Sequence, residues 1–104
     1  MDVPNVANMV TRCQELARAV RITANRADPN DADNLISALK SLQGTIGKLH
    51  MPISVKANIE KIVAGCVSDA LWIQTSFNPL EIKSLLGQIP GWLESVRELL
   101  PKSP

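Results

Sequence analysis

Apolar residues recur at intervals of three and four along almost the whole 104-residue chain, which is the spacing of one face of an α-helix. Short stretches that contain proline with asparagine, aspartate or histidine interrupt this pattern. The predicted helices cover about residues 4–26, 29–49, 53–77 and 79–100. Because the connections are short, consecutive helices should pack antiparallel. We therefore predict an all-α fold: a single up-down four-helix bundle over residues 1–104, as a candidate N-terminal domain of a longer protein.

The first predicted helix has one face wide enough for core packing. Its apolar set is Val6, Met9, Val10, Cys13, Leu16, Ala17, Val20 and Ala24. On the opposite face, Arg18, Arg21 and Arg26 surround one apolar residue, Ile22. Two interpretations are open. The face is either solvated with a stray isoleucine, or it is a basic surface that meets anionic lipid or an acidic partner, with Ile22 as its apolar contact.

Two helix starts have clear signals. Asp28 and Asn78 are good N-cap residues, and each is followed by a proline at the first helical position. Glu81 is placed to complete a capping box with Asn78. Asp28, Asp31 and Asp33 form the main carboxylate cluster, but the glycine and distal glutamate of a calcium loop are missing. We assign this cluster to capping.

Proline and glycine occur inside two of the predicted helices. Pro90 should kink or break the last helix, yet the apolar spacing continues in phase after it. One kinked helix is therefore favoured over two. Gly44 and Gly47 lower the helix propensity of the second segment. They either let a neighbouring helix approach, leave a cavity suited to an apolar ligand, or mark a frayed end.

The tryptophans differ in their predicted places. Trp72 and its neighbour Leu71 lie off the main apolar stripe of the third helix. An exposed tryptophan is a favoured hot spot at interfaces, although Trp72 could instead pack against the side of another helix. Trp92 falls on the core stripe of the last helix, so we predict a structural role for it.

Composition limits the classes of partner. The chain is 45% apolar and 20% charged with a net charge of +1, so we expect no nucleic-acid partner. No apolar run reaches membrane-spanning length, and the N-terminus has no secretory pattern. We expect a cytoplasmic protein with the option of peripheral membrane attachment. Cys13 and Cys66 lie on apolar stripes and are read as buried thiols rather than a disulfide.

No residue cluster supports chemistry. His50 is the single histidine and falls in a predicted turn, without a nucleophile at a known spacing. The two cysteines are too far apart in sequence to form a paired zinc motif. We therefore expect no catalytic site, no cofactor and no metal, and we expect that the protein is not an enzyme.

A family resemblance follows from the order of the segments. The leucine-spaced second helix spans residues 33–49, and the loop at Met51 and Pro52 and the stretch 59–66 follow it. With the amphipathic segment 80–100, this order resembles the N-terminal helical domains of fungal HeLo-type proteins and the four-helix bundle of mixed-lineage kinase domain-like proteins. The resemblance implies a non-enzymatic immune or cell-death module that self-associates and engages membrane.

Two functions are predicted. The first is a signalling module that oligomerises and attaches to anionic membrane through Arg18, Arg21, Ile22 and Arg26. The alternative is a soluble adaptor that docks a helix or peptide of a partner protein, with Leu71 and Trp72 among its contacts.

Overall fold

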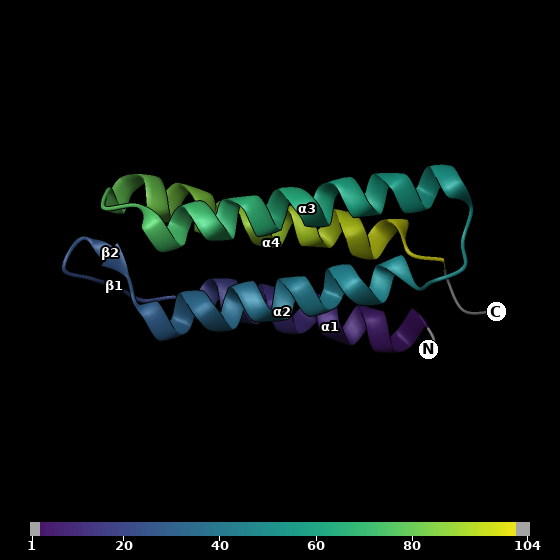
Figure 1. Ribbon diagram of the computed structural model, residues 1–104, viewed down its shortest axis with the longest axis horizontal. Coiled ribbons are helices and arrows are strands. Elements are labelled where there is room, and N and C mark those ends of the chain that lie inside the picture. Colours follow the sequence, from purple (N-terminus) through teal and green to yellow (C-terminus); the bar gives the residue numbers. More distant parts are fainter. Residues whose placement is uncertain (1–2, 102–104) are drawn as a thin grey trace.

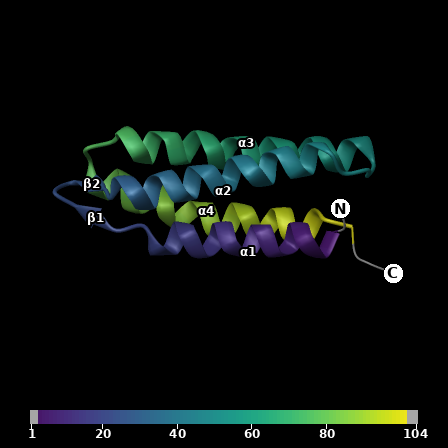
Figure 2. The ribbon, with the colours of Figure 1, turned by 60° about the horizontal axis from the view of Figure 1, so that its bottom comes forward.

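The computed structural model describes residues 3–101, with side chains from residue 5 onward. Its elements are α1 (Val3–Ala19), β1 (Ile22–Thr23), β2 (Arg26–Ala27), α2 (Pro29–Gly47), α3 (Ile53–Thr75) and α4 (Pro79–Leu99). The helices run up and down in a ring in which α1 and α3 each pack against both α2 and α4 (Figures 1 and 2). The predicted all-α four-helix bundle is confirmed.

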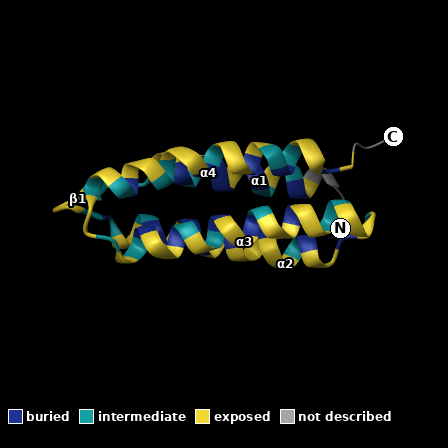
Figure 3. Cartoon of the chain, turned by 90° about the horizontal axis from the view of Figure 1, so that it is seen from above, coloured by how far each residue is buried: buried dark blue, intermediate teal, exposed yellow. Residues whose placement is uncertain are grey.

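The core is aliphatic and runs the length of a bundle that measures 47 × 20 × 18 Å. Each helix turns one stripe inward and leaves the rest exposed (Figure 3). The largest fully buried side chains are Val6, Val10, Leu35, Leu39, Leu42, Ile46, Ile59, Val63, Ile73, Ile82, Ile89 and Leu93. Burying one such side chain contributes about 1.5–3 kcal/mol relative to leaving it in water. The three-and-four spacing therefore selects most of the core, although Ala24 and Trp92, which share that spacing, are exposed.

The predicted N-caps are confirmed at both sites. The Asp28 carboxylate accepts a hydrogen bond from the backbone N–H of Asp31 at 3.1 Å. The Asn78 side chain accepts from the backbone N–H groups of Leu80 and Glu81 at 3.1 and 3.3 Å. The predicted capping box is wrong, because the Asn78 N–H donates to Ser76 Oγ instead and leaves the Glu81 side chain for other donors.

The first helix is shorter than predicted, since it ends at Ala19 and not at Arg26. The chain then forms a small hairpin in which Ile22 pairs with Ala27 and Thr23 with Arg26. The two residues of its turn have positive φ angles, as in a type I′ turn. This hairpin lies at the end of the bundle where α3 turns into α4 (Figure 1).

Pro90 lies within one continuous helix, α4, which confirms a single last helix over two. Of the alternatives left open for Gly44 and Gly47, the close approach of a neighbouring helix is wrong. An added Cβ at Gly44 or Gly47 would meet no atom within 4 Å, and both residues are exposed on α2. The two predicted ends are also slightly long, because α2 ends at Gly47 and α3 at Thr75.

Candidate interaction site

Exposed large apolar side chains gather on one half of the bundle. Among the described side chains they are Ile53, Leu71, Trp72, Phe77, Leu80, Trp92 and Leu99. All of them belong to α3, to α4 or to the turn between these helices. By contrast, the outward faces of α1 and α2 carry polar, charged or small residues in the described region. This asymmetry marks the outer surface of α3 and α4, called here the α3/α4 face, as the part of the molecule that differs from an ordinary solvated surface.

A groove of about 590 Å³ follows the α3/α4 face. Ile62, Gly65 and Cys66 line it from α3, and Trp92 and Leu99 line it from α4. Its polar lining residues are Asn58, Lys61, Asp69 and Gln88. The open space beside the glycine exists because no side chain fills it, and an added Cβ there would meet no atom within 4 Å. The groove is therefore mainly apolar and open to solvent along its length.

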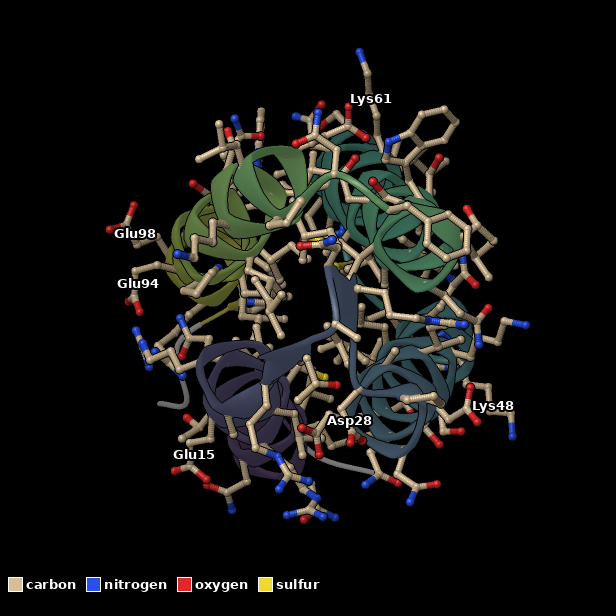
Figure 4. The ribbon with its side chains drawn as sticks, turned by 90° about the vertical axis from the view of Figure 1, so that its left-hand side faces the viewer. Glu15, Asp28, Lys48, Lys61, Glu94 and Glu98 are labelled. Carbon is tan, nitrogen blue, oxygen red and sulfur yellow. The ribbon has the colours of Figure 1, made fainter. Side chains whose placement is uncertain are left out.

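Asp69 is the acidic residue that lines this groove, and it is half-buried. Burial raises the pKa of its carboxyl above the usual value, because a charged group loses hydration there. The described residues provide it with no ion pair or hydrogen bond. Lys61 points away from the bundle (Figure 4). The groove thus offers an unpaired carboxylate beside apolar surface.

Trp72 extends the same face toward the α3–α4 turn. It lies three residues after Asp69, which places both on one side of the helix. The indole is 59% exposed, and its Nε1–H donates to Glu81 Oε1 on α4. Ser76 Oγ also donates to that oxygen, at 3.3 Å. These bonds hold the indole ring across the two helices while its apolar surface stays in solvent.

The predicted basic face of the first helix does not form, because its residues belong to different elements. Arg21 follows the end of α1, and its Nε donates to Asp31 Oδ2 at 2.9 Å, with Asp28 Oδ2 at 3.7 Å from Nη2. The hydrogen bond to Asp31 and the charge of both carboxylates raise the pKa of Arg21. The same bond, together with one from the Arg21 backbone N–H, lowers the pKa of Asp31. Arg21 is therefore occupied in fixing the entry to α2.

Arg26 lies in β2 with its guanidinium carbon 5.4 Å from the centre of the Phe77 ring, a cation–π contact. Arg18 stays exposed on α1 and shares a shallow groove with Ile22, at the junction of α1 and α4. Of the three predicted arginines, the structure therefore places one beside Ile22 and engages the other two elsewhere.

The thiols are buried and uninvolved in a disulfide. Burial raises the pKa of Cys13 to about 11 and that of Cys66 to about 12, which leaves little thiolate at neutral pH. In the described region, no group of three histidine, cysteine or acidic residues is placed to hold a metal ion. Among residues 3–101, no helix combines the length and apolar character that crossing a bilayer requires.

The sequence missed Trp92, whose predicted structural role on the core stripe is wrong. Its side chain is 50% exposed and lines the groove. The stripe of α4 is centred on Ile82, Ile89, Leu93 and Val96, so Trp92 lies at its edge, where helical spacing alone does not separate core from surface. The large size of tryptophan was the one indication of exposure in the sequence, because this side chain is rarely buried completely.

Comparison of the chain with protein-family models, with curated proteins and with solved structures finds no match. The resemblance to HeLo-type domains therefore stays a prediction.

Proposed function

We propose that this chain is a non-enzymatic docking module that binds an amphipathic helix of a partner protein along the α3/α4 face. The observation that carries the proposal is the segregation of every described, exposed large apolar side chain to α3, α4 and their turn. Apolar helices dock in grooves through residues spaced at three, four and seven positions. A groove between two helices, with a tryptophan on one wall and a glycine on the other, suits such a ligand.

The energetics favour Trp92 and Trp72 as anchors. Tryptophan is enriched among interface residues whose truncation to alanine costs about 2 kcal/mol or more of binding free energy. The indole of Trp72 is already held by its hydrogen bond to Glu81, so its side chain would lose little conformational entropy when a partner binds. The unpaired carboxylate of Asp69 favours a partner helix that carries a basic residue beside its apolar stripe.

Membrane attachment through the first helix has less support than docking on the α3/α4 face. The residues of α1 from Val3 to Ala19 include Arg12 and Arg18 with Glu15, a net charge of +1 from two arginines and one glutamate. Each basic residue contributes only about 1 kcal/mol at an anionic surface. Arg21 and Arg26, which the predicted face required, contact Asp31 and Phe77 instead.

A subtractive selection tests the docking function. A displayed library of helical peptides is selected on the wild-type protein in the presence of excess Gly65→Leu protein. We expect that variant to fill the groove and to keep its fold, because an added Cβ at Gly65 meets no atom within 4 Å. We expect enrichment of peptides with apolar residues at helical spacing and at least one basic residue. Their binding should weaken in Trp92→Ala protein and persist in Arg18→Glu protein.

Two outcomes would contradict the proposal. One is the absence of enrichment over an unselected library. The other is a set of peptides that bind wild-type and Gly65→Leu protein equally well. Light scattering across a concentration series accompanies the selection. Assembly that is lost in Gly65→Leu protein would assign the face to a second copy of the chain, and would overturn the partner-helix function.

A further inference from the structure

A second groove, of about 680 Å³, lies between the end of α1 and the middle of α4, away from the α3/α4 face. Arg18 stands on its α1 side and Lys83 on its α4 side. Half-buried Val20, Ile22 and Leu86 supply apolar surface between them. Two cations therefore flank an apolar floor that is built from residues of both helices and of the hairpin.

Neither cation is neutralised within the chain. In the part that the structure describes, Arg18 and Lys83 form no ion pair and no hydrogen bond, unlike Arg21. No acidic residue lines the groove. Both side chains are exposed and so remain hydrated in the free protein. Their charges are available to an anionic ligand without the loss of an existing contact.

We propose that this groove binds an acidic amphipathic helix of a partner protein. Carboxylates on the two flanks of such a helix would meet Arg18 and Lys83, while its apolar residues cover Val20, Ile22 and Leu86. Charge complementarity of this kind gives specificity and speeds association. This site differs from the proposed α3/α4 docking site in its residues and in its charge, because its charged lining residues are both basic, whereas Lys61 and Asp69 of opposite charge line the α3/α4 groove.

The apolar surface of the groove favours a helix over a lipid surface. Arg18 and Lys83 lie on different helices, one on each side of a shallow groove, where the two flanks of a docked helix would meet them. Membrane-bound amphipathic surfaces also expose large apolar side chains that enter the headgroup region. The described residues of α1 and the hairpin expose none, since Val20 and Ile22 are half-buried.

The test uses two labelled model peptides of equal length, one built from leucine and glutamate at helical spacing and one with lysine in place of glutamate. Fluorescence anisotropy measures their binding to the full chain. We expect the glutamate peptide to bind. We also expect Arg18→Glu/Lys83→Glu to weaken that binding by about tenfold or more, as for other close charge pairs at interfaces. The lysine peptide should not compete for this groove.

Two variants separate the groove from general charge. Gly87→Leu fills the groove, and an added Cβ there meets no atom within 4 Å, so the fold should persist. It should abolish binding of the glutamate peptide. Lys40→Glu reverses an exposed lysine on α2 outside the groove and should leave binding unchanged. Circular dichroism confirms that each variant is folded.

Three results would overturn the proposal. The glutamate peptide could fail to bind, it could bind Gly87→Leu protein as well as wild type, or Lys40→Glu could weaken it as much as the double reversal. Vesicles that contain phosphatidylserine provide the lipid arm. Vesicle binding lost in Arg18→Glu/Lys83→Glu but kept in Gly87→Leu would assign these cations to a membrane. Gly65→Leu protein should bind the glutamate peptide normally, so failure here and failure of the α3/α4 site are distinguishable.

Discussion

Gln14 of α1 donates a hydrogen bond from Nε2 to the backbone carbonyl oxygen of Pro90 in α4, at 3.0 Å. Its other contacts complete a small network. Gln14 Nε2 also donates to Glu94 Oε1 at 3.2 Å, and Gln14 Oε1 accepts from Arg97 Nη2 at 2.9 Å. Gln14 is the buried polar side chain of the described region. This contact joins α1 to α4 at the turn of α4 that contains Pro90.

Gln14→Ala should destabilise the protein by about 0.5–1.5 kcal/mol, because it removes the hydrogen bonds that join α1 to Pro90, Glu94 and Arg97 of α4. Urea unfolding followed by circular dichroism measures the change. Asn8→Ala, an exposed position on the same helix, is the control and should not destabilise the protein, because alanine is the better helix former. Equal effects of the two variants would mean that the network does not hold α1 to α4.

Ala24→Asn should stabilise the hairpin by roughly 0.5–1 kcal/mol. Ala24 has φ of 51°, a left-handed conformation that its Cβ disfavours and that asparagine tolerates. Thermal unfolding measures the gain. Ala57→Asn, at an exposed helical position in α3, should instead cost about 0.5 kcal/mol through helix propensity. A loss of stability in Ala24→Asn would argue that α1 continues past Ala19.

Gly44→Ala should stabilise α2 by about 0.5–1 kcal/mol, since alanine is the better helix former and the added Cβ meets open space. The reverse change at an exposed alanine, Ala64→Gly in α3, should cost a similar amount. Chemical denaturation of both variants provides the comparison. A destabilised Gly44→Ala protein would show that a neighbouring helix packs on this glycine after all.

The native thiols should react slowly with a thiol reagent such as DTNB. Burial raises the pKa values of Cys13 and Cys66 to about 11 and about 12, from 9.0. Only the thiolate reacts, so the folded protein should stay nearly inert at pH 8 and react fully in urea. An added exposed thiol in Ala64→Cys should react at once. Fast reaction of the native protein would place Cys13 or Cys66 at the surface.

The wild-type protein should lose more stability in acid than the Asp31→Asn protein does. Its folded pKa is lowered from 3.8 by the hydrogen bond from Arg21. The stabilisation is therefore present above the unfolded pKa and is lost as pH falls through the folded value. Thermal unfolding of wild type and Asp31→Asn should differ at pH 7 and converge at strongly acidic pH. A constant difference across this range would exclude the ion pair as the cause.

Periodicity predicted the four helices and most of the core, because the buried face of a helix follows from the spacing of apolar residues, but this spacing did not separate Trp92 from the core. It failed after Ala19, where Val20 and Ala24 continue the apolar spacing although the backbone forms a turn. The preference of Asn25 for positive φ, together with β-branched Ile22 and Thr23, was the available local signal. Such signals are weaker than a four-turn helical pattern.

The sequence left the exposure of Trp72 open, and the structure resolves it in favour of a solvent-exposed side chain, whereas the predicted arginine face does not form. An off-stripe tryptophan remains exposed wherever its helix packs with a single stripe. The arginine face, however, required α1 to extend through Arg26 and required that Arg21 find no carboxylate. Both conditions depend on where the chain turns. The placement of Arg18 and Lys83 beside one groove also depends on it. The spacing of residues along a single helix therefore could not predict these arrangements.

The most direct test of the docking account uses the fluorescence of Trp92. In Trp72→Phe protein, Trp92 is the one remaining tryptophan. This protein is titrated with the helical leucine–lysine peptide. The account predicts a saturable shift of emission to shorter wavelength, absent in Trp72→Phe/Gly65→Leu protein, because the indole leaves water as the groove fills. Unchanged emission at every peptide concentration, or an equal shift in both proteins, would contradict the assignment of the α3/α4 groove as the binding site.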